Sequence, residues 1–197
     1  MRKDVIHLSI KLGCIFILLT AVFAVTYYEN AELARELLEP YFETLEGFMT
    51  EDGGISFVDI WLNNLFACAR TVAMGILPLV YLPLLSVLSN ATVIGTVLGL
   101  TAAEAKISLA NSILYMILPH GIFEMPALFL SFGLGFYICK WLTRRFFRRN
   151  LEDKRTFLDL MNGVAKGFVL AVIPLVTVAA LIECFVTPEI MAWAGLA

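Results

Sequence analysis

The chain has 197 residues, of which 60% are hydrophobic and only 16% are charged, and its mean hydropathy is +0.85. Because soluble domains carry about 25% charged residues, this composition excludes an ordinary water-soluble domain with an aqueous active site. The formal net charge is only −3, and the basic residues are explained by membrane topology rather than by nucleic-acid binding. We therefore expect an integral membrane protein whose main partner is the lipid bilayer, with no nucleic-acid partner.

Uncharged stretches of about 17 to 25 residues indicate transmembrane helices. They predict an all-α, polytopic bundle that forms one membrane domain, with about five spans at 6–28, 57–82, 84–100, 111–141 and 165–186. The first stretch is similar to a secretory signal peptide, since basic residues precede an apolar core. However, residues 27–30 read Tyr-Tyr-Glu-Asn, which is a poor cleavage site, so an uncleaved first span is expected.

The distribution of lysine and arginine predicts the orientation of these spans. The segment 140–155 contains seven basic residues and should be cytoplasmic: Lys140, Arg144, Arg145, Arg148, Arg149, Lys154 and Arg155. The N-terminus has three more basic residues, whereas the segment 29–52 has eight acidic residues and one arginine. We therefore expect an inner or plasma membrane protein with a cytoplasmic N-terminus and an outer C-terminus.

The outer loop at 30–50 has the pattern of an amphipathic helix. Apolar residues recur every three or four positions, and glutamates occupy the rest of the wheel. Pro40 should break or bend this helix. Packing on the protein itself is expected, and docking of a partner protein is the alternative.

Ionisable side chains inside membrane spans indicate either a functional site or an internal ion pair, because each costs about 2.5–3.5 kcal/mol on insertion scales. Four of those in the predicted spans stand out: Arg70, His120, Glu124 and Glu183. Arg70 lies midway along the second span, near Asn63 and Asn64, and the two glutamates are its available partners. Both interpretations stay open from the residues alone.

The most irregular stretch of the chain lies in the predicted fourth span. Pro119 and Pro126 each lack a backbone donor, and Gly121 permits unusual backbone dihedrals, so the helix should be broken at membrane depth. If the chain remains helical after Gly121, His120 and Glu124 lie one turn apart on the same face.

His120, Glu124 and Glu183 are also the candidate ligands for a metal ion. However, the His-x-x-x-Glu run lacks the second histidine of the metalloprotease pattern, and the other histidine, His7, lies at the cytoplasmic edge. The four cysteines are dispersed without a Cys-x-x-Cys pair, so they predict neither a zinc site nor a disulfide framework. The sequence therefore predicts no bound metal and no cofactor, and it supports no catalytic nucleophile.

Gly95 and Gly99 form a Gly-x-x-x-Gly motif in the predicted third span. Such motifs let helix backbones approach closely. The motif indicates a compact bundle or a homodimer without choosing between them.

Residues 119–127 read Pro-His-Gly-Ile-Phe-Glu-Met-Pro-Ala, which resembles the Pro-His-Gly-x-x-Glu-x-Pro-Ala run of the stage II sporulation protein M family. The resemblance covers about 57–188 and includes Asn63 or Asn64, the glycine-rich third span, and Glu183 followed by Thr187-Pro188. It implies an all-helical inner-membrane protein without established enzymatic activity. It also implies, for a sporulating member, a membrane anchor for peptidoglycan-cutting proteins during engulfment of the forespore.

Three functions follow as hypotheses. The first is a scaffold for a cell-envelope complex, which would bind membrane or wall-associated proteins through the outer loop at 30–50. The second is a transporter or channel component, in which Arg70, His120, Glu124 and Glu183 form a proton- or ion-coupled site. The third is an intramembrane metal-dependent hydrolase, and stoichiometric zinc would be its signature.

Overall fold

The computed structural model describes residues 2–46, 56–104, 107–147 and 155–195, which are almost entirely helical and contain no strand. The elements are α1 (Arg2–Glu29), α2 (Ala31–Glu46), α3 (Phe57–Met74), α4 (Pro83–Glu104), α5 (Leu109–Ser112), η1 (Ile113–Ile117), α6 (Leu118–Phe147), α7 (Phe157–Gly167), η2 (Phe168–Val172), α8 (Ile173–Phe185) and α9 (Thr187–Trp193). Here η1 and η2 are π-helical turns that continue directly into the helices after them. The predicted all-α fold is confirmed.

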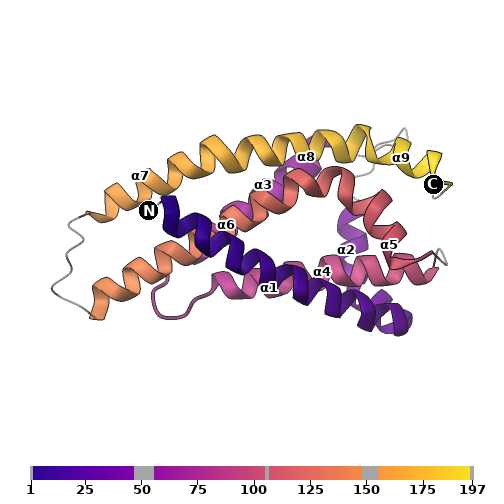
Figure 1. Cartoon of the computed structure of the whole chain (residues 1–197), viewed down its shortest axis with the longest axis horizontal. Helices are drawn as coiled ribbons and strands as arrows, with labels where there is room; N and C mark the ends of the chain where they lie inside the picture. The colour runs from indigo at the N-terminus through magenta and orange to yellow at the C-terminus, as the bar shows by residue number, and fades with distance from the viewer. Residues whose placement is uncertain (1, 47–55, 105–106, 148–154, 196–197) are drawn as a thin grey trace.

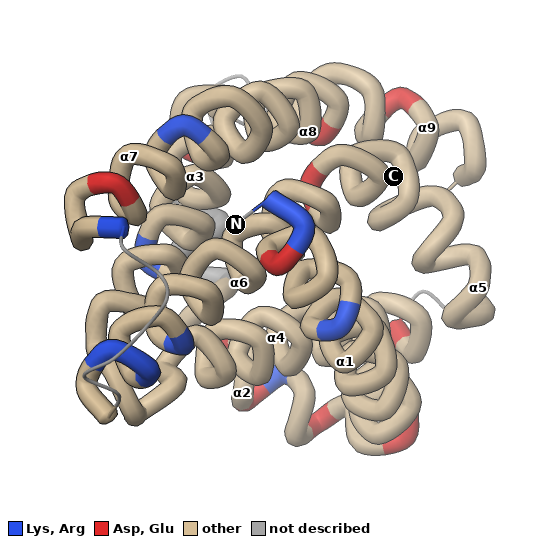
Figure 2. The backbone as a smooth tube through the Cα atoms, turned by 60° about the vertical axis from the view of Figure 1, so that its left-hand side comes forward, with Lys and Arg blue, Asp and Glu red and all other residues tan. Residues whose placement is uncertain are grey.

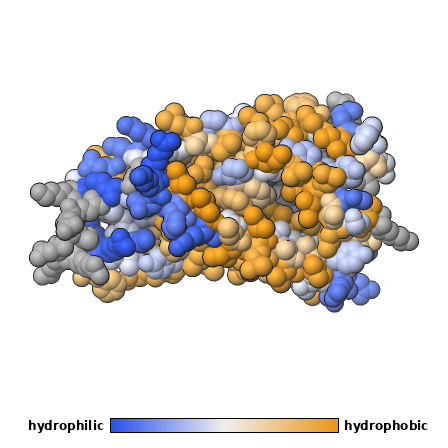
Figure 3. Space-filling model, in the orientation of Figure 1, coloured by the Kyte–Doolittle hydropathy of each residue, from blue (hydrophilic) through white to orange (hydrophobic). Residues whose placement is uncertain are grey.

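The long helices run roughly along one axis, and the two ends of the chain lie at opposite ends of the bundle (Figure 1). A broad apolar band covers the middle of the face seen in Figure 3, with hydrophilic residues toward both ends. Four described segments are long and apolar enough to cross a membrane, at Arg2–Glu29, Pro83–Glu104, Leu109–Phe147 and Phe157–Trp193. This is the layout of a membrane-spanning helical bundle.

The predicted second span is not among these four segments. Its helix, α3, has 18 residues and includes Asp59 and Arg70, and it packs against both α6 and α8. The helix ends at Met74, although the prediction extended to residue 82. Pro78 and Pro83 explain the early end, because proline disfavours helix in the residue before it. The division into five spans stays a prediction, since it depends on α3 crossing the membrane.

The connection between α3 and α4 is held against the second half of α6. The sequence predicts that this half lies toward the cytoplasm. Leu79 and Tyr81 adopt positive φ angles of 74° and 49°. The Leu79 backbone N–H donates to Thr143 Oγ1 at 2.9 Å, and the Cys139 thiol donates to the Leu77 carbonyl at 3.3 Å. These bonds hold the loop between α3 and α4 in place.

The Gly-x-x-x-Gly motif of α4 packs within the chain, against α1. A Cβ atom on Gly95 would lie 2.7 Å from the Thr20 carbonyl oxygen, and one on Gly99 would lie 2.8 Å from the Tyr28 nitrogen. Any larger residue would therefore push the two backbones apart. Of the two alternatives that the sequence left open, this motif serves the compact bundle.

Helix α6 forms the centre of the bundle, with contacts to α1, α3, α4 and α8. Its middle, residues 127–141, is largely buried, and Phe132 and Ile138 are fully inaccessible. The Phe132 and Phe129 rings pack against Phe16 of α1, with centroids 5.8 and 5.6 Å apart. This dense packing fixes the position of α6, and it thereby also positions the side chains in the first half of the helix.

The predicted amphipathic helix is α2, and it continues through Pro40 instead of breaking there. Its apolar face packs against α4, where Ala34 and Leu38 bury almost all of their surface beside Leu100. Arg35 forms an ion pair with Glu104 at the end of α4. The expected packing of this helix on the protein itself is thus present.

Basic residues gather at the end of the bundle that carries the N-terminus, around the start of α1, the end of α6 and the start of α7 (Figure 2). Arg145 of α6 donates a hydrogen bond to the Arg155 carbonyl at 3.4 Å, which draws the end of α6 toward the residues that precede α7. Residues 148–154 lie outside the described residues, so the predicted basic loop at 140–155 is described only at its two ends. That this end faces the cytoplasm stays a prediction.

Candidate functional site

Helix α6 presents an imidazole and a carboxylate one turn apart, as the sequence predicts. His120 Nε2 and Glu124 Oε2 are separated by 3.6 Å, and the two side chains are only 10% and 21% exposed. That distance is longer than a direct hydrogen bond. The two groups are therefore neighbours without a direct hydrogen bond between these two atoms.

The helix is irregular just before this pair. Leu118–Phe147 is one continuous helix with Pro126 inside it, and the change in hydrogen bonding lies in η1, immediately before Pro119. Proline has no backbone N–H to donate to the carbonyl four residues before it, and a π-helical turn changes the hydrogen-bonding pattern so that this donor is not needed. Such turns are frequent at functional sites. The helix is therefore not broken between Pro119 and Pro126 as predicted; the irregularity is the π-helical turn at Ile113–Ile117, and Figure 1 shows the chain bending between α5 and α6.

The fourth long segment repeats this arrangement. The π-helical turn η2 lies just before Pro174, which is among the first residues of α8. Helix α8 then packs against α6, with Ala179 and Ala180 fully buried. These small residues allow the two helices to approach closely, and the approach brings the next turn of α8 to His120.

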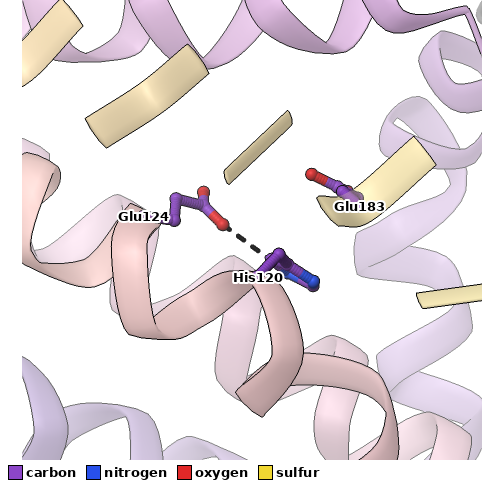
Figure 4. A group of neighbouring side chains, drawn as sticks. All are labelled: His120, Glu124 and Glu183. Carbon is purple, nitrogen blue, oxygen red and sulfur yellow. Dashed lines mark ion pairs between the residues drawn. The ribbon is translucent and has the colours of Figure 1, made fainter. Parts of the chain in front are cut away.

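Glu183 of α8 completes a three-residue cluster with His120 and Glu124, here called the His-Glu-Glu cluster. One ligand atom from each side chain lies within 4.8 Å of the other two. Figure 4 shows the side chains converging from two helices. Glu183 Oε2 is buried and has no hydrogen-bond partner in the part of the chain that the structure describes. The cluster therefore contains two closely spaced acidic groups, and one oxygen of Glu183 is left without a partner among the described residues.

The imidazole is oriented by Thr187 at the start of α9. Thr187 Oγ1 donates to the Ile182 carbonyl at 3.2 Å and lies 3.5 Å from His120 Nδ1. Since a hydroxyl group has one hydrogen, we infer that this oxygen accepts from Nδ1–H. His120 Nε2 then directs a lone pair toward the Glu124 carboxylate, which requires a positive charge or a proton between them.

A cavity of about 260 Å³, lined by both polar and apolar side chains, reaches this cluster at Glu124. Its lining includes these polar side chains from α2, α3, α4 and α6: Tyr41, Asn63, Asn64, Arg70, Ser89, Asn90 and Glu124. The cavity has room for several water molecules. Asn64 also interacts with the Glu183 carboxylate, so α3 links the cavity to the far side of the cluster.

The structure brings together most of the residues that the sequence selected, with one exception. His120, Glu124, Glu183 and Asn64 meet, and Asn63 lies beside Asn64 with a 3.5 Å amide contact. Arg70 lines the same cavity, but it makes no ion pair with either glutamate among the described residues. The pairing of Arg70 that the sequence suggested is therefore absent here.

Sequence reasoning overlooked three contributors. Thr187 was noted only as part of a family run, and Ser89 and Asn90 of α4 were not selected. The signal that could have identified them is their polarity, because uncharged polar residues within apolar spans often face a helix interface or a cavity. Sequence spacing alone could not show that they lie near Glu124.

Comparison with known proteins agrees with this geometry. The family model of stage II sporulation protein M matches residues 12–188, a range that contains the whole His-Glu-Glu cluster. The chain belongs to this family. The resemblance predicted from residues 119–127 is thereby confirmed, and the family's description links such membrane proteins to sporulation.

The chain is similar to an uncharacterized protein of Methanocaldococcus jannaschii, to which it is 30% identical over 152 residues. The match covers 77% of this chain and 65% of the relative, so the chain spans less than two thirds of that protein's length. No solved structure matches the chain.

We predict that Arg70→Gln changes the free energy of unfolding by less than about 0.5 kcal/mol, because no ion pair is lost. Thr71→Val, on the next residue, should cost about 1–3 kcal/mol, since its buried hydroxyl bonds to Ser86. Denaturant unfolding of the detergent-solubilised chain measures both. A loss of about 3–5 kcal/mol for Arg70→Gln would instead reveal a buried ion pair.

Proposed function

We propose that this chain is a membrane transport component in which a proton or a small cation reaches the carboxylates of Glu124 and Glu183. The observation that carries the proposal is the cavity that ends on Glu124. Ionisable groups at membrane depth are costly and often mark ion pathways or proton relays. A cavity that reaches such a group supplies a route for water or an ion.

The state of the cluster favours a working site over a structural ion pair. A structural role would be served by mutual pairing, because an unpaired buried charge is destabilising. Arg70 makes no such pair among the described residues, and Glu183 Oε2 lacks a hydrogen-bond partner there. A proton or an ion that completes the cluster explains why the chain keeps these groups.

We expect wild-type protein reconstituted in vesicles to carry protons or Mn²⁺ above the level of empty vesicles. Internal dyes that report pH and Mn²⁺ measure the two fluxes. Glu124→Gln and Glu183→Gln should lower the flux to the level of empty vesicles, because both remove a charge from the route.

The matched control is Glu189→Gln, which changes an exposed glutamate of α9 and should leave the flux unchanged. Circular dichroism and size-exclusion chromatography establish that each variant is folded. If folded wild-type protein gives the same traces as empty vesicles with both dyes, the transport proposal is wrong.

A scaffold for a cell-envelope complex is the second candidate, and the surface of α2 favours it. The helix buries Ala34 and Leu38, yet Leu33 and Leu37 are each 49% exposed between glutamates. The family's link to sporulation supports a role with other envelope proteins. In this proposal the basic end of the bundle is cytoplasmic, and α2 lies outside the plasma membrane, where it binds a membrane or wall-associated protein.

The scaffold role predicts that Leu33→Ser with Leu37→Ser abolishes a photo-crosslink to a partner in native membranes. Deleting residues 30–50 would be a poorer test, because Leu38 is packed and Tyr41 lines the cavity. Leu158→Ser, at an exposed leucine of α7, is the control. A partner that survives the α2 changes but is lost with Glu124→Gln would contradict docking through α2.

A further inference from the structure

The charge of the His-Glu-Glu cluster limits what can occupy it. Two carboxylates carry two negative charges when ionised, and the imidazole is neutral if its proton is on Nδ1. No lysine or arginine forms an ion pair with them in the described ranges. A single divalent cation would make the cluster electrically neutral, which is the state that an apolar surrounding favours.

We propose that His120, Glu124 and Glu183 bind a divalent transition-metal ion, of which Zn²⁺ and Mn²⁺ are the probes. This inference rests on the proposed function, because it names the class of cation that would bind at the proposed transport site. It also replaces the expectation from sequence that the chain binds no cofactor.

The positions of the ligand atoms suit a metal ion. The three ligand atoms lie within 4.8 Å of one another. Ligands at about 2.0–2.2 Å from Zn²⁺ are roughly 3.5 Å apart in a tetrahedron, so only small side-chain movements are needed. The orphaned Glu183 Oε2 supplies a buried acceptor that gains a partner when an ion binds.

The ligand chemistry selects the class of ion. One imidazole nitrogen with two carboxylate oxygens suits Zn²⁺, Mn²⁺ or Fe²⁺, whereas Ca²⁺ prefers six to eight oxygen ligands and Mg²⁺ an octahedron of oxygens. Three protein ligands also leave a coordination position for water or a solute. The cavity at Glu124 gives that position access to polar surroundings.

The hydrogen bonding around the cluster prepares the imidazole for an ion. In the tautomer inferred above, Thr187 Oγ1 accepts from His120 Nδ1–H, and the Nε2 lone pair faces Glu124. Metal-binding histidines commonly donate their other N–H to a neighbouring oxygen in this way. Thr187 is therefore a positioning residue, and it comes from a third helix, α9.

The test is metal binding by the full chain, purified in detergent, stripped with a chelator, and dialysed separately against Zn²⁺ and Mn²⁺. We expect about one ion per chain by elemental analysis. His120→Ala, Glu124→Gln and Glu183→Gln should each reduce this to below roughly a tenth of an ion. The matched controls His7→Ala and Glu189→Gln alter exposed residues and should bind as wild type does.

A separate readout follows the role of Thr187. Thr187→Val should keep the three ligands but weaken affinity by about 10- to 100-fold, and Thr187→Ser should restore it. The visible spectrum of bound Co²⁺ reports whether the imidazole remains a ligand.

The outcomes separate the metal site from transport. Bound metal that all three ligand variants abolish, without ion flux, supports the metal site and removes the transport proposal. Flux without stoichiometric metal overturns the metal site and leaves a proton pathway. Metal that His7→Ala removes, or that folded ligand variants retain, also overturns the site.

Discussion

Two carboxylates, on Glu124 and Glu183, lie close together inside an apolar helical bundle, where little water screens their charges. The surrounding structure reduces this repulsion with the His120 ring, the Asn64 amide and the cavity at Glu124. These groups come from α3, α6 and α8. The cluster therefore needs all three helices in register, and a change in any contact between them would alter its electrostatics.

The register is fixed at some distance from the cluster. The rings of Phe16, Phe129 and Phe132 hold α6 against α1, and the buried Ala179 and Ala180 let α8 approach α6. Two π-helical turns, each before a proline, adjust the same two segments near the site. The apolar core thus lies at one level of the bundle, and the π-helical turns and the polar cluster lie at another.

The sequence was sufficient where short-range patterns decide the structure. Hydropathy predicted the apolar helices, the three- and four-residue spacing predicted α2, and the i, i+4 spacing joined His120 to Glu124. It was insufficient where the partner lies far along the chain. Nothing local shows that Glu183, Thr187 and Asn64 converge on His120, or that Arg70 stays apart from both carboxylates. The loop after α3 is held by Thr143 of α6, which is also a non-local contact.

The central claim is that Glu124 and Glu183 share one site, and a double-mutant cycle tests it most directly. The free energy of unfolding would be measured for chelator-stripped wild type, Glu124→Gln, Glu183→Gln and the double variant. Because either substitution removes the same repulsion, we predict non-additivity of more than about 1 kcal/mol. Effects that add to within about 0.5 kcal/mol would show that the two carboxylates are independent, and would contradict the account.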